Sequence, residues 1–193
     1  MKVLLMVPEL NVGGVETHVL SLAGGMARAG REVVVVSNGG AMVPTLEATG
    51  AEHVSLPIHR KSPLTIREMS ARVAEIIRER DIDIVHAHSR VPAWISYFAV
   101  RRMRSSLVLS AHGQYTPHMG SRVMAYGDRI ICVSRVIRDH LVQKLGAPPL
   151  KTTIVYNGID LRQVEKAVAG AKTPAEMKAE LGLPGGAPLV GLI

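Results

Sequence analysis

The sequence predicts a doubly wound α/β domain built on a parallel sheet of about seven strands. Short apolar runs rich in β-branched residues alternate along the chain with stretches in which apolar residues recur at helical spacing. Continuously apolar strands are typical of a parallel sheet that helices cover on both faces. Because crossovers between parallel strands are almost always right-handed, this alternation predicts a Rossmann-like sheet.

Seven apolar runs are predicted as strands. KVLLMV at 2–7 and REVVVVS at 31–37 are apolar over most of their length, and a weaker run follows at 51–57. The remaining predicted strands are 81–88, 105–112, 129–134 and 152–157.

Amphipathic stretches between these runs are predicted as helices. The stretch 15–30 has one apolar face and ends at Gly30, and the stretch 62–80 has an apolar face opposite a charged one. Further helices are predicted at 90–104, 117–127 and 134–146.

The last part of the chain differs in composition. Thr173 with Glu176 three residues later is a capping box, which predicts a short helix followed by a Pro- and Gly-rich linker. The apolar run LVGLI at 189–193 reads as a new strand without a partner. We therefore expect a fragment, with one domain at 1–170 and the beginning of a second, missing domain at 171–193.

Composition limits the classes of function. Apolar residues make up 47% of the 193 residues and aromatic residues 3%, so aliphatic side chains must fill the core. Cys132 is the single cysteine, which excludes an intrachain disulfide and favours a buried thiol in a cytoplasmic protein. A net charge of +7 indicates either an anionic partner or an ordinary basic surface, and scarce aromatic residues argue against nucleic acid.

The loop after the first predicted strand contains Gly13 and Gly14, with Glu16 and His18 just inside the following helix. Glycine allows close backbone approach and positive φ, and a helix N-terminus offers free N–H groups to a phosphate. The alternative is a plain tight turn, with Glu16 complementing the helix dipole and His18 capping or packing. A dehydrogenase is disfavoured because no G-x-G-x-x-G motif is present and no acid ends the second strand.

Polar residues also follow the later strands, where a cleft is expected in an open parallel sheet. They are His86, His88, His112, Ser134 and Asn157. His86, His88 and His112 could form a three-histidine metal site, or His86 could be a hydrogen-bonded core residue. Ser134 also fits the N-cap of the next helix.

The motifs GGVETHVLSLA, DIVHAHS, LSAHG, DRIICVSRVIRDHL and TIVYNGID, in this order, resemble the amino-terminal domain of family 4 glycosyltransferases. The resemblance implies the first half of a GT-B fold, in which two Rossmann-like domains enclose a cleft. It implies a retaining hexosyl transfer from a nucleotide-sugar donor to a sugar or lipid-linked acceptor, without a metal or cofactor. The stretch around GQYTPHMGSRVMAYGDR resembles members that make cell-envelope polysaccharide or lipopolysaccharide.

The resemblance also implies roles for individual residues. Gly13 and Gly14 match the loop that meets the donor phosphates, and His112 matches the histidine beside the transferred sugar. The remaining candidates for donor or acceptor contact are Glu16, His18, His88, Ser134 and Asn157. Most of the donor site would lie in the missing second domain, so we expect this chain alone to be inactive.

Two rival functions stay open at this stage. One is a metal-dependent hydrolase that uses His86, His88 and His112. The other is a basic module that lies on an anionic membrane through 90–104, which carries Trp94, Tyr97 and Phe98 together with four arginines, Arg90, Arg101, Arg102 and Arg104. A transferase could also lie peripherally on the inner face of the cell membrane, held there by its basic charge.

Overall fold

The computed structural model describes residues 1–159, 161–186 and 188. The chain divides into two compact units, Met1–Asn157 and Gly158–Ile193. The sequence places residues 158–170 in the first domain, whereas the structure groups them with the second unit. The division of a longer protein at 170 and 171 stays a prediction.

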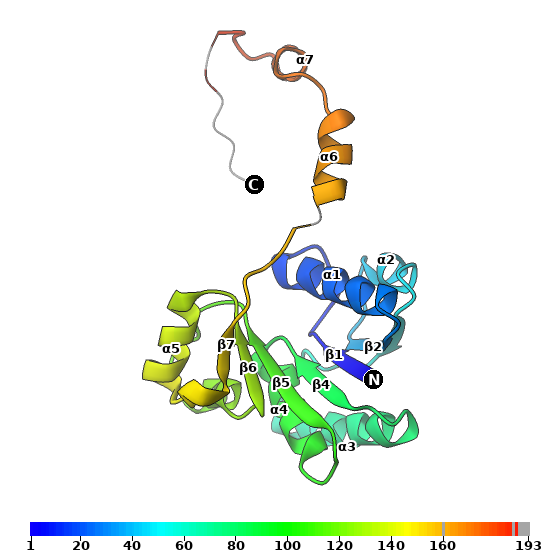
Figure 1. Ribbon diagram of the computed structural model, residues 1–193, viewed down its shortest axis with the longest axis vertical. Helices are drawn as coiled ribbons and strands as arrows, with labels where there is room; N and C mark the ends of the chain where they lie inside the picture. Colours follow the sequence, from blue (N-terminus) through cyan, green and yellow to red (C-terminus); the bar gives the residue numbers. More distant parts are fainter. Residues whose placement is uncertain (160, 187, 189–193) are drawn as a thin grey trace. The chain divides into compact units, whose positions relative to one another are not determined.

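The first unit is built on one seven-stranded parallel sheet in the order β3-β2-β1-β4-β5-β6-β7 (Figure 1). The strands are β1 (Lys2–Met6), β2 (Glu32–Ser37), β3 (Glu52–Ser55), β4 (Ile84–Ala87), β5 (Ser106–Ala111), β6 (Arg129–Cys132) and β7 (Thr152–Ile154). The predicted fold class is confirmed, and each strand lies within a predicted run. β2 and β3 extend the sheet on one side of β1, and β4 to β7 extend it on the other. Ligands bind beside such a switch point, here between β1 and β4, in sheets of this kind.

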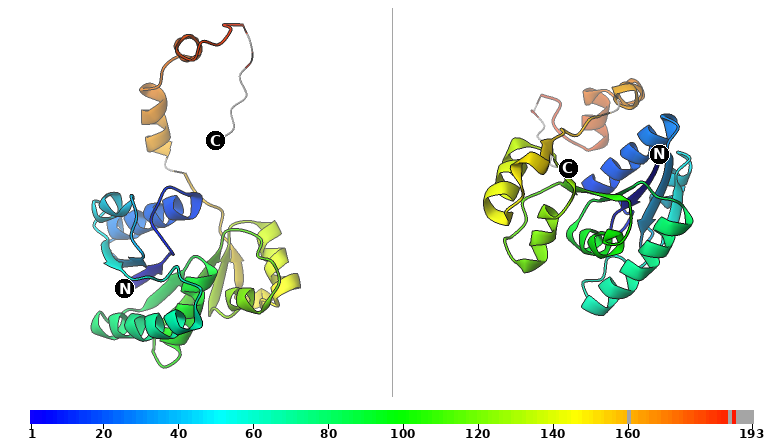
Figure 2. Two further views of the ribbon diagram at one scale, coloured as in Figure 1. Left: turned by 180° about the vertical axis from the view of Figure 1, so that it is seen from behind. Right: turned by 60° about the horizontal axis from the view of Figure 1, so that its bottom comes forward.

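Helices cover both faces of this sheet. They are α1 (Gly14–Arg28), α2 (Val43–Glu47), α3 (Pro63–Glu79), α4 (Arg90–Val100) and α5 (Arg135–Leu145), with short 3₁₀ segments η1 (Met119–Ala125) and η2 (Pro149–Lys151). Figures 1 and 2 show α1 and α2 on one face, with α3 and α4 on the other. Because β1 and β2 are buried on both faces, alternate residues join different cores: Leu5 and Val35 pack with Val19 of α1, while Leu4 and Val34 pack with Val73 of α3.

The structure differs from the sequence prediction at two places in this unit. The stretch 117–127 forms the 3₁₀ segment η1 rather than an α-helix. The short helix α2, which begins beside Pro44, was not predicted.

The second unit contains α6 (Leu161–Ala169), which was not predicted, and α7 (Pro174–Glu180). The predicted capping box is confirmed: the Glu176 amide donates to Thr173 Oγ1 at 3.3 Å, and the Thr173 amide donates to Glu176 Oε2 at 2.7 Å. The run predicted as a strand at 189–193 lies outside the described residues. In the described part of the chain, no helix combines the length and apolar character needed to cross a membrane.

Candidate functional site at the carboxyl edge of the sheet

The loop that follows β1 is held in place by the loop that follows β2. The Leu10 amide donates to Gly39 O and the Met42 amide donates to Leu10 O, each at 2.8 Å. Gly40 has a φ of +145°, and a Cβ at this position would collide with the Leu10 carbonyl group. Close backbone approach therefore requires a glycine at 40, which supports the loop that leads to Gly13.

Gly13 and Gly14 begin α1, but neither has the positive φ that the sequence suggested. Gly13 is the N-cap with an extended backbone (φ −175°), and a side chain there would collide with the Glu16 carboxylate. A Cβ on Gly14 would meet open space, with no atom of the described chain within 4 Å. A side chain at 13 needs only the flexible Glu16 carboxylate to move, so intrachain packing gives a weak reason for a glycine at 13 and none for one at 14.

Three imidazoles converge from three different elements beside this loop. His18 comes from α1, and His88 and His112 directly follow β4 and β5. His88 Nδ1 and His112 Nε2 lie 3.1 Å apart in a hydrogen bond, and the His18 ring centroid is 5.0 Å from that of His112 and 5.7 Å from that of His88. We call His18, His88 and His112 the histidine cluster.

The predicted grouping of His86 with His88 and His112 as metal ligands is wrong. The His86 Nε2 atom lies 2.7 Å from Ser110 Oγ in a buried hydrogen bond on β5, so this nitrogen is already engaged. The interpretation of His86 as a hydrogen-bonded core residue is confirmed. His86 still supports the cluster, because its ring centroid lies 4.2 Å from that of His88.

Burial keeps the histidine cluster uncharged. Burial first, and then the neighbouring histidines, hold the pKa of His88 well below its usual value. Burial and then His18 lower the pKa of His112 to about 4, and burial also lowers the pKa of His18. At pH 7 these rings are therefore neutral hydrogen-bonding groups, and the positive charge at this edge must come from elsewhere.

A second wall of the site is made by the start of α4 and the loop after β5. Arg90 Nη1 reaches both His118 Nε2 and Ser121 Oγ at 3.4 Å, and its guanidinium lies 5.6 Å from the centre of the Tyr115 ring. Trp94 Nε1 donates to Gly120 O at 2.9 Å, which fastens η1 to α4. These contacts order a loop that begins at His112.

A cavity of about 290 Å³ lies along this wall. It is lined by Lys61, Ile66, Arg90, Val91, Trp94, His118 and Gly120. Sequence reasoning considered Arg90 and Trp94 only as a membrane-facing surface and did not single out Lys61 or His118. The available signal was position, since all four follow strands at the same edge of the sheet.

Ser134 and Asn157 follow β6 and β7, farther along the sheet. The Ile137 amide donates to Ser134 Oγ at 3.3 Å, which confirms Ser134 as the N-cap of α5. Asn157 is exposed. Within the described residues no hydrogen bond or ion pair joins either residue to the histidine cluster, so their roles in ligand binding stay predictions.

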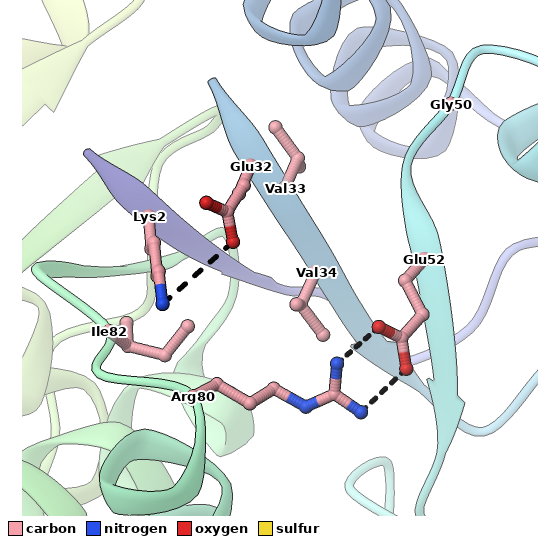
Figure 3. Close-up of a pocket in the computed structure, with 8 residues that line it drawn as sticks. All are labelled: Lys2, Glu32, Val33, Val34, Gly50, Glu52, Arg80 and Ile82. Carbon is pink, nitrogen blue, oxygen red and sulfur yellow. Dashed lines mark hydrogen bonds and ion pairs between the residues drawn. The ribbon is translucent and has the colours of Figure 1, made fainter. Parts of the chain in front are cut away.

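A second cavity, of about 300 Å³, lies at the opposite, amino edge of the sheet (Figure 3). Its polar groups already pair with one another: Arg80 Nη2 donates to Glu52 Oε1 at 2.6 Å, and Lys2 Nζ lies 3.9 Å from Glu32 Oε2. Glu52 raises the pKa of Arg80 through this hydrogen bond. Paired charges leave little unmet capacity for a ligand, so size does not make this cavity the functional site.

Comparison with known proteins identifies relatives that match most of this chain. The chain is 28% identical to phosphatidyl-myo-inositol mannosyltransferase of Mycolicibacterium smegmatis, over 77% of this chain and 41% of that protein. A glycosyltransferase structure from Rickettsia africae matches 97% of this chain and 51% of its own, with 25% identity and a TM-score of 0.82. HepE from Anabaena, in complex with UDP-glucose, matches 94% of this chain and 50% of its own, with 19% identity and a TM-score of 0.73, which shows the shared fold.

The chain thus spans about half the length of these relatives. The sequence model of glycosyltransferase family 4 matches residues 12–163, which include the first glycine loop, the histidine cluster and the second wall. The chain belongs to glycosyltransferase family 4.

Proposed function

We propose that this chain forms the acceptor-side domain of a retaining hexosyltransferase, which moves a sugar from a nucleotide-sugar donor to a sugar or lipid-linked acceptor. The carboxyl edge of the sheet supports this proposal most directly, because an open glycine, a helix N-terminus and neutral imidazoles lie together there. Family membership and the UDP-glucose bound to HepE favour a nucleotide-sugar donor.

The loop at Gly13 and Gly14 is assigned to the donor phosphates. Cleavage of a sugar–diphosphate bond builds negative charge on the leaving phosphate, and preorganised N–H groups stabilise that charge as it develops. The first amides of a helix have no partner within the helix, and open space at Gly14 allows an oxygen to approach the backbone of α1 there. Glu16 lies in the same turn, so its carboxylate must move aside when a phosphate binds.

His112 is assigned to the transferred sugar. A neutral imidazole with a lowered pKa is a poor proton acceptor at pH 7, and its useful property is directional hydrogen bonding to a hydroxyl group. His88 holds one ring nitrogen of His112, which fixes the orientation of the ring. His18 lies beside both rings and completes the polar surface.

The cavity along α4 is assigned to the acceptor. Lys61 and Arg90 supply positive charge, while Ile66, Val91 and Trp94 supply apolar surface. Such a mixture suits an amphipathic acceptor that carries an anionic group, which agrees with a lipid-linked molecule. The mycobacterial relative is named for phosphatidyl-myo-inositol, an anionic lipid.

Cell-envelope polysaccharide or lipopolysaccharide synthesis is the proposed pathway, and a peripheral position at the inner membrane surface accompanies it. Phe98 and Arg101 near the end of α4 are exposed. Trp94 and Tyr97 instead pack against the core and contact Tyr126. The apolar part of α4 thus mainly covers the sheet, which favours weak, charge-driven membrane contact over insertion.

The proposed function is tested with a full-length protein that contains this chain. Transfer from a panel of nucleotide sugars to an envelope lipid extract is measured, and the configuration of the product is determined by NMR. The proposal expects transfer with retained configuration and none from the 193-residue chain alone. Hydrolysis without transfer, or transfer by the isolated chain, would contradict it.

A further inference from the structure

The histidine cluster has a second property that sugar transfer does not require. His18, His88 and His112 each offer one ring nitrogen, and these three nitrogens lie within 4.8 Å of one another. Their ring centroids are 5.0, 5.4 and 5.7 Å apart. Three imidazoles from a helix and two strand ends therefore face one small volume.

This spacing is close to that of a three-histidine metal centre. Zinc binds imidazole nitrogen at about 2.0–2.1 Å, so tetrahedral ligands lie about 3.4 Å apart. His88 Nδ1 and His112 Nε2 are already 3.1 Å apart. His18 is only partly buried, and its ring already lies beside those of His88 and His112, so a change of rotamer can complete the triangle.

His88 contributes its Nδ1 atom to this volume, on the side of the ring that faces His112. His88 is 1% exposed, and its Nε2 atom is buried without a hydrogen-bond partner in the described part of the chain. Coordination through Nδ1 breaks the hydrogen bond to His112, and the shared proton moves to the far nitrogen of the ring that carried it. Both facing nitrogens then offer lone pairs, and no net proton is released.

The ligand set selects the kind of ion. Three imidazoles with no carboxylate in the cluster suit borderline late first-row ions, whereas Mg²⁺ and Ca²⁺ prefer oxygen ligands. Three protein ligands leave a fourth position for water.

We propose that His18, His88 and His112 bind one zinc-like divalent transition-metal ion at the carboxyl edge of the sheet. The site itself does not depend on the proposed function. One consequence does rest on it: the ion occupies the His112 ring that sugar transfer needs, so it inhibits the enzyme.

The test uses the untagged 193-residue chain after treatment with a chelator. Zinc binding is measured by calorimetry, and tetrahedral Co²⁺ is followed by its visible absorption. We expect one ion per chain with a dissociation constant of about 1 µM or tighter, and no competition from Mg²⁺.

His18→Asn and His112→Asn are the decisive variants, because both side chains are only partly buried and circular dichroism can verify that the variants fold. Each should weaken zinc binding at least about a hundredfold, since loss of a ligand exceeds the 10–100-fold effect of losing a ligand's hydrogen-bond partner. His53→Asn, outside the cluster, should bind like the wild type. His86→Gln removes a neighbouring ring but no ligand, so it should weaken binding less than either decisive variant.

Absence of stoichiometric binding would overturn the proposal, as would equal affinity in His18→Asn, His112→Asn and His53→Asn. Loss of binding in His86→Gln alone would restore the grouping first suggested by the sequence. Inhibition is measured separately in the active full-length protein, where a fully active zinc-loaded enzyme would overturn the inhibitory role while the calorimetry decides the site.

Discussion

The two edges of the sheet differ in how their polar groups are satisfied. At the amino edge, charged side chains pair with one another: Arg80 with Glu52, and Lys2 with Glu32 and Asp81. At the carboxyl edge, the histidine cluster is neutral, with His88 buried and His18 and His112 partly buried. Gly14 faces open space, and a buried nitrogen of His88 has no partner in the described chain. A cavity lies at each edge, but unmet hydrogen-bonding capacity is found at the carboxyl edge.

The two edges should also differ in how they respond to substitution. Surface ion pairs contribute about 0–1 kcal/mol each, so the amino edge can tolerate substitution. Burial of the histidines opposes their protonation and so lowers their pKa values. Groups with shifted pKa values of this kind cluster at functional sites, where they contact a ligand. The carboxyl edge should therefore respond strongly to changes that leave the amino edge unaffected.

The largest expected effect is on the loop support at Gly40. Gly40→Ala forces a Cβ into the Leu10 backbone at a φ of +145°, and should lower the free energy of unfolding by about 4 kcal/mol. Gly39→Ala is the matched control, since Gly39 has a φ of +88° but open space around it, and should cost about 1–2 kcal/mol. Urea unfolding measures both, and equal losses would show that the close approach to Leu10 has no energetic role.

The next effect is a pH dependence of stability. Burial, and then His18 and His112, lower the pKa of His86 from 6.5 to about 3. The unfolded chain therefore binds a proton at His86 below about pH 6.5 that the folded chain does not, so stability falls as pH drops toward 3. One such proton corresponds to about 1.4 kcal/mol per pH unit.

His86→Gln keeps a hydrogen-bonding side chain opposite Ser110 and removes this titration. Its unfolding free energy should fall less steeply between pH 6 and pH 4.5, by roughly one proton in slope. Identical slopes for the variant and the wild type would mean that folding does not exclude the His86 proton.

His112→Ala should lower turnover of the full-length enzyme at least tenfold, or about 1.4 kcal/mol of barrier, with little change in melting temperature. The reason is loss of an oriented hydrogen bond to the transferred sugar. Arg80→Gln at the amino edge is the control and should keep wild-type turnover. Equal activity in both variants would remove the functional distinction between the edges.

Gly14→Val should have the smallest effect on the fold. Its Cβ enters open space, so we expect the melting temperature to stay within a few degrees, corresponding to less than about 1 kcal/mol. Affinity of the full-length protein for its nucleotide sugar should nevertheless fall, because the side chain occupies the path of a phosphate. A large drop in melting temperature with unchanged affinity would make Gly14 a structural turn residue.

The sheet was predictable because its strands are apolar on both faces. Runs such as VVVV at 33–36 have no alternating polar face, which identifies buried parallel strands without knowledge of their neighbours. The short helix α2 was missed because five residues span little more than one turn and give no clear period. Similarly, η1 has helical spacing, and spacing alone does not distinguish a 3₁₀ segment, here capped by the His118 side chain, from an α-helix.

The site was only partly predictable for a related reason. His88 and His112 follow from their positions at strand ends, which parallel topology brings to one edge. The choice between His18 and His86 depends on the rotation of α1 over the sheet and on Ser110 facing His86, and neither is encoded in local spacing. The second wall was missed since Lys61, Arg90 and His118 are far apart in sequence and converge only through the loops after β3, β4 and β5.

The most direct measurement of the central claim is an NMR titration of the isotope-labelled 193-residue chain with UDP-glucose. Binding to this chain alone should be no tighter than about millimolar, roughly −4 kcal/mol, because few contacts offset the lost freedom of the ligand. Free and bound protein then exchange quickly on the NMR time scale, so the signals that shift identify the residues at the site. The account predicts that signals from residues 12–18 and from His88 and His112 shift together, while those of Lys2, Glu52 and Arg80 stay fixed. Shifts confined to Lys2, Glu52 and Arg80 would contradict it.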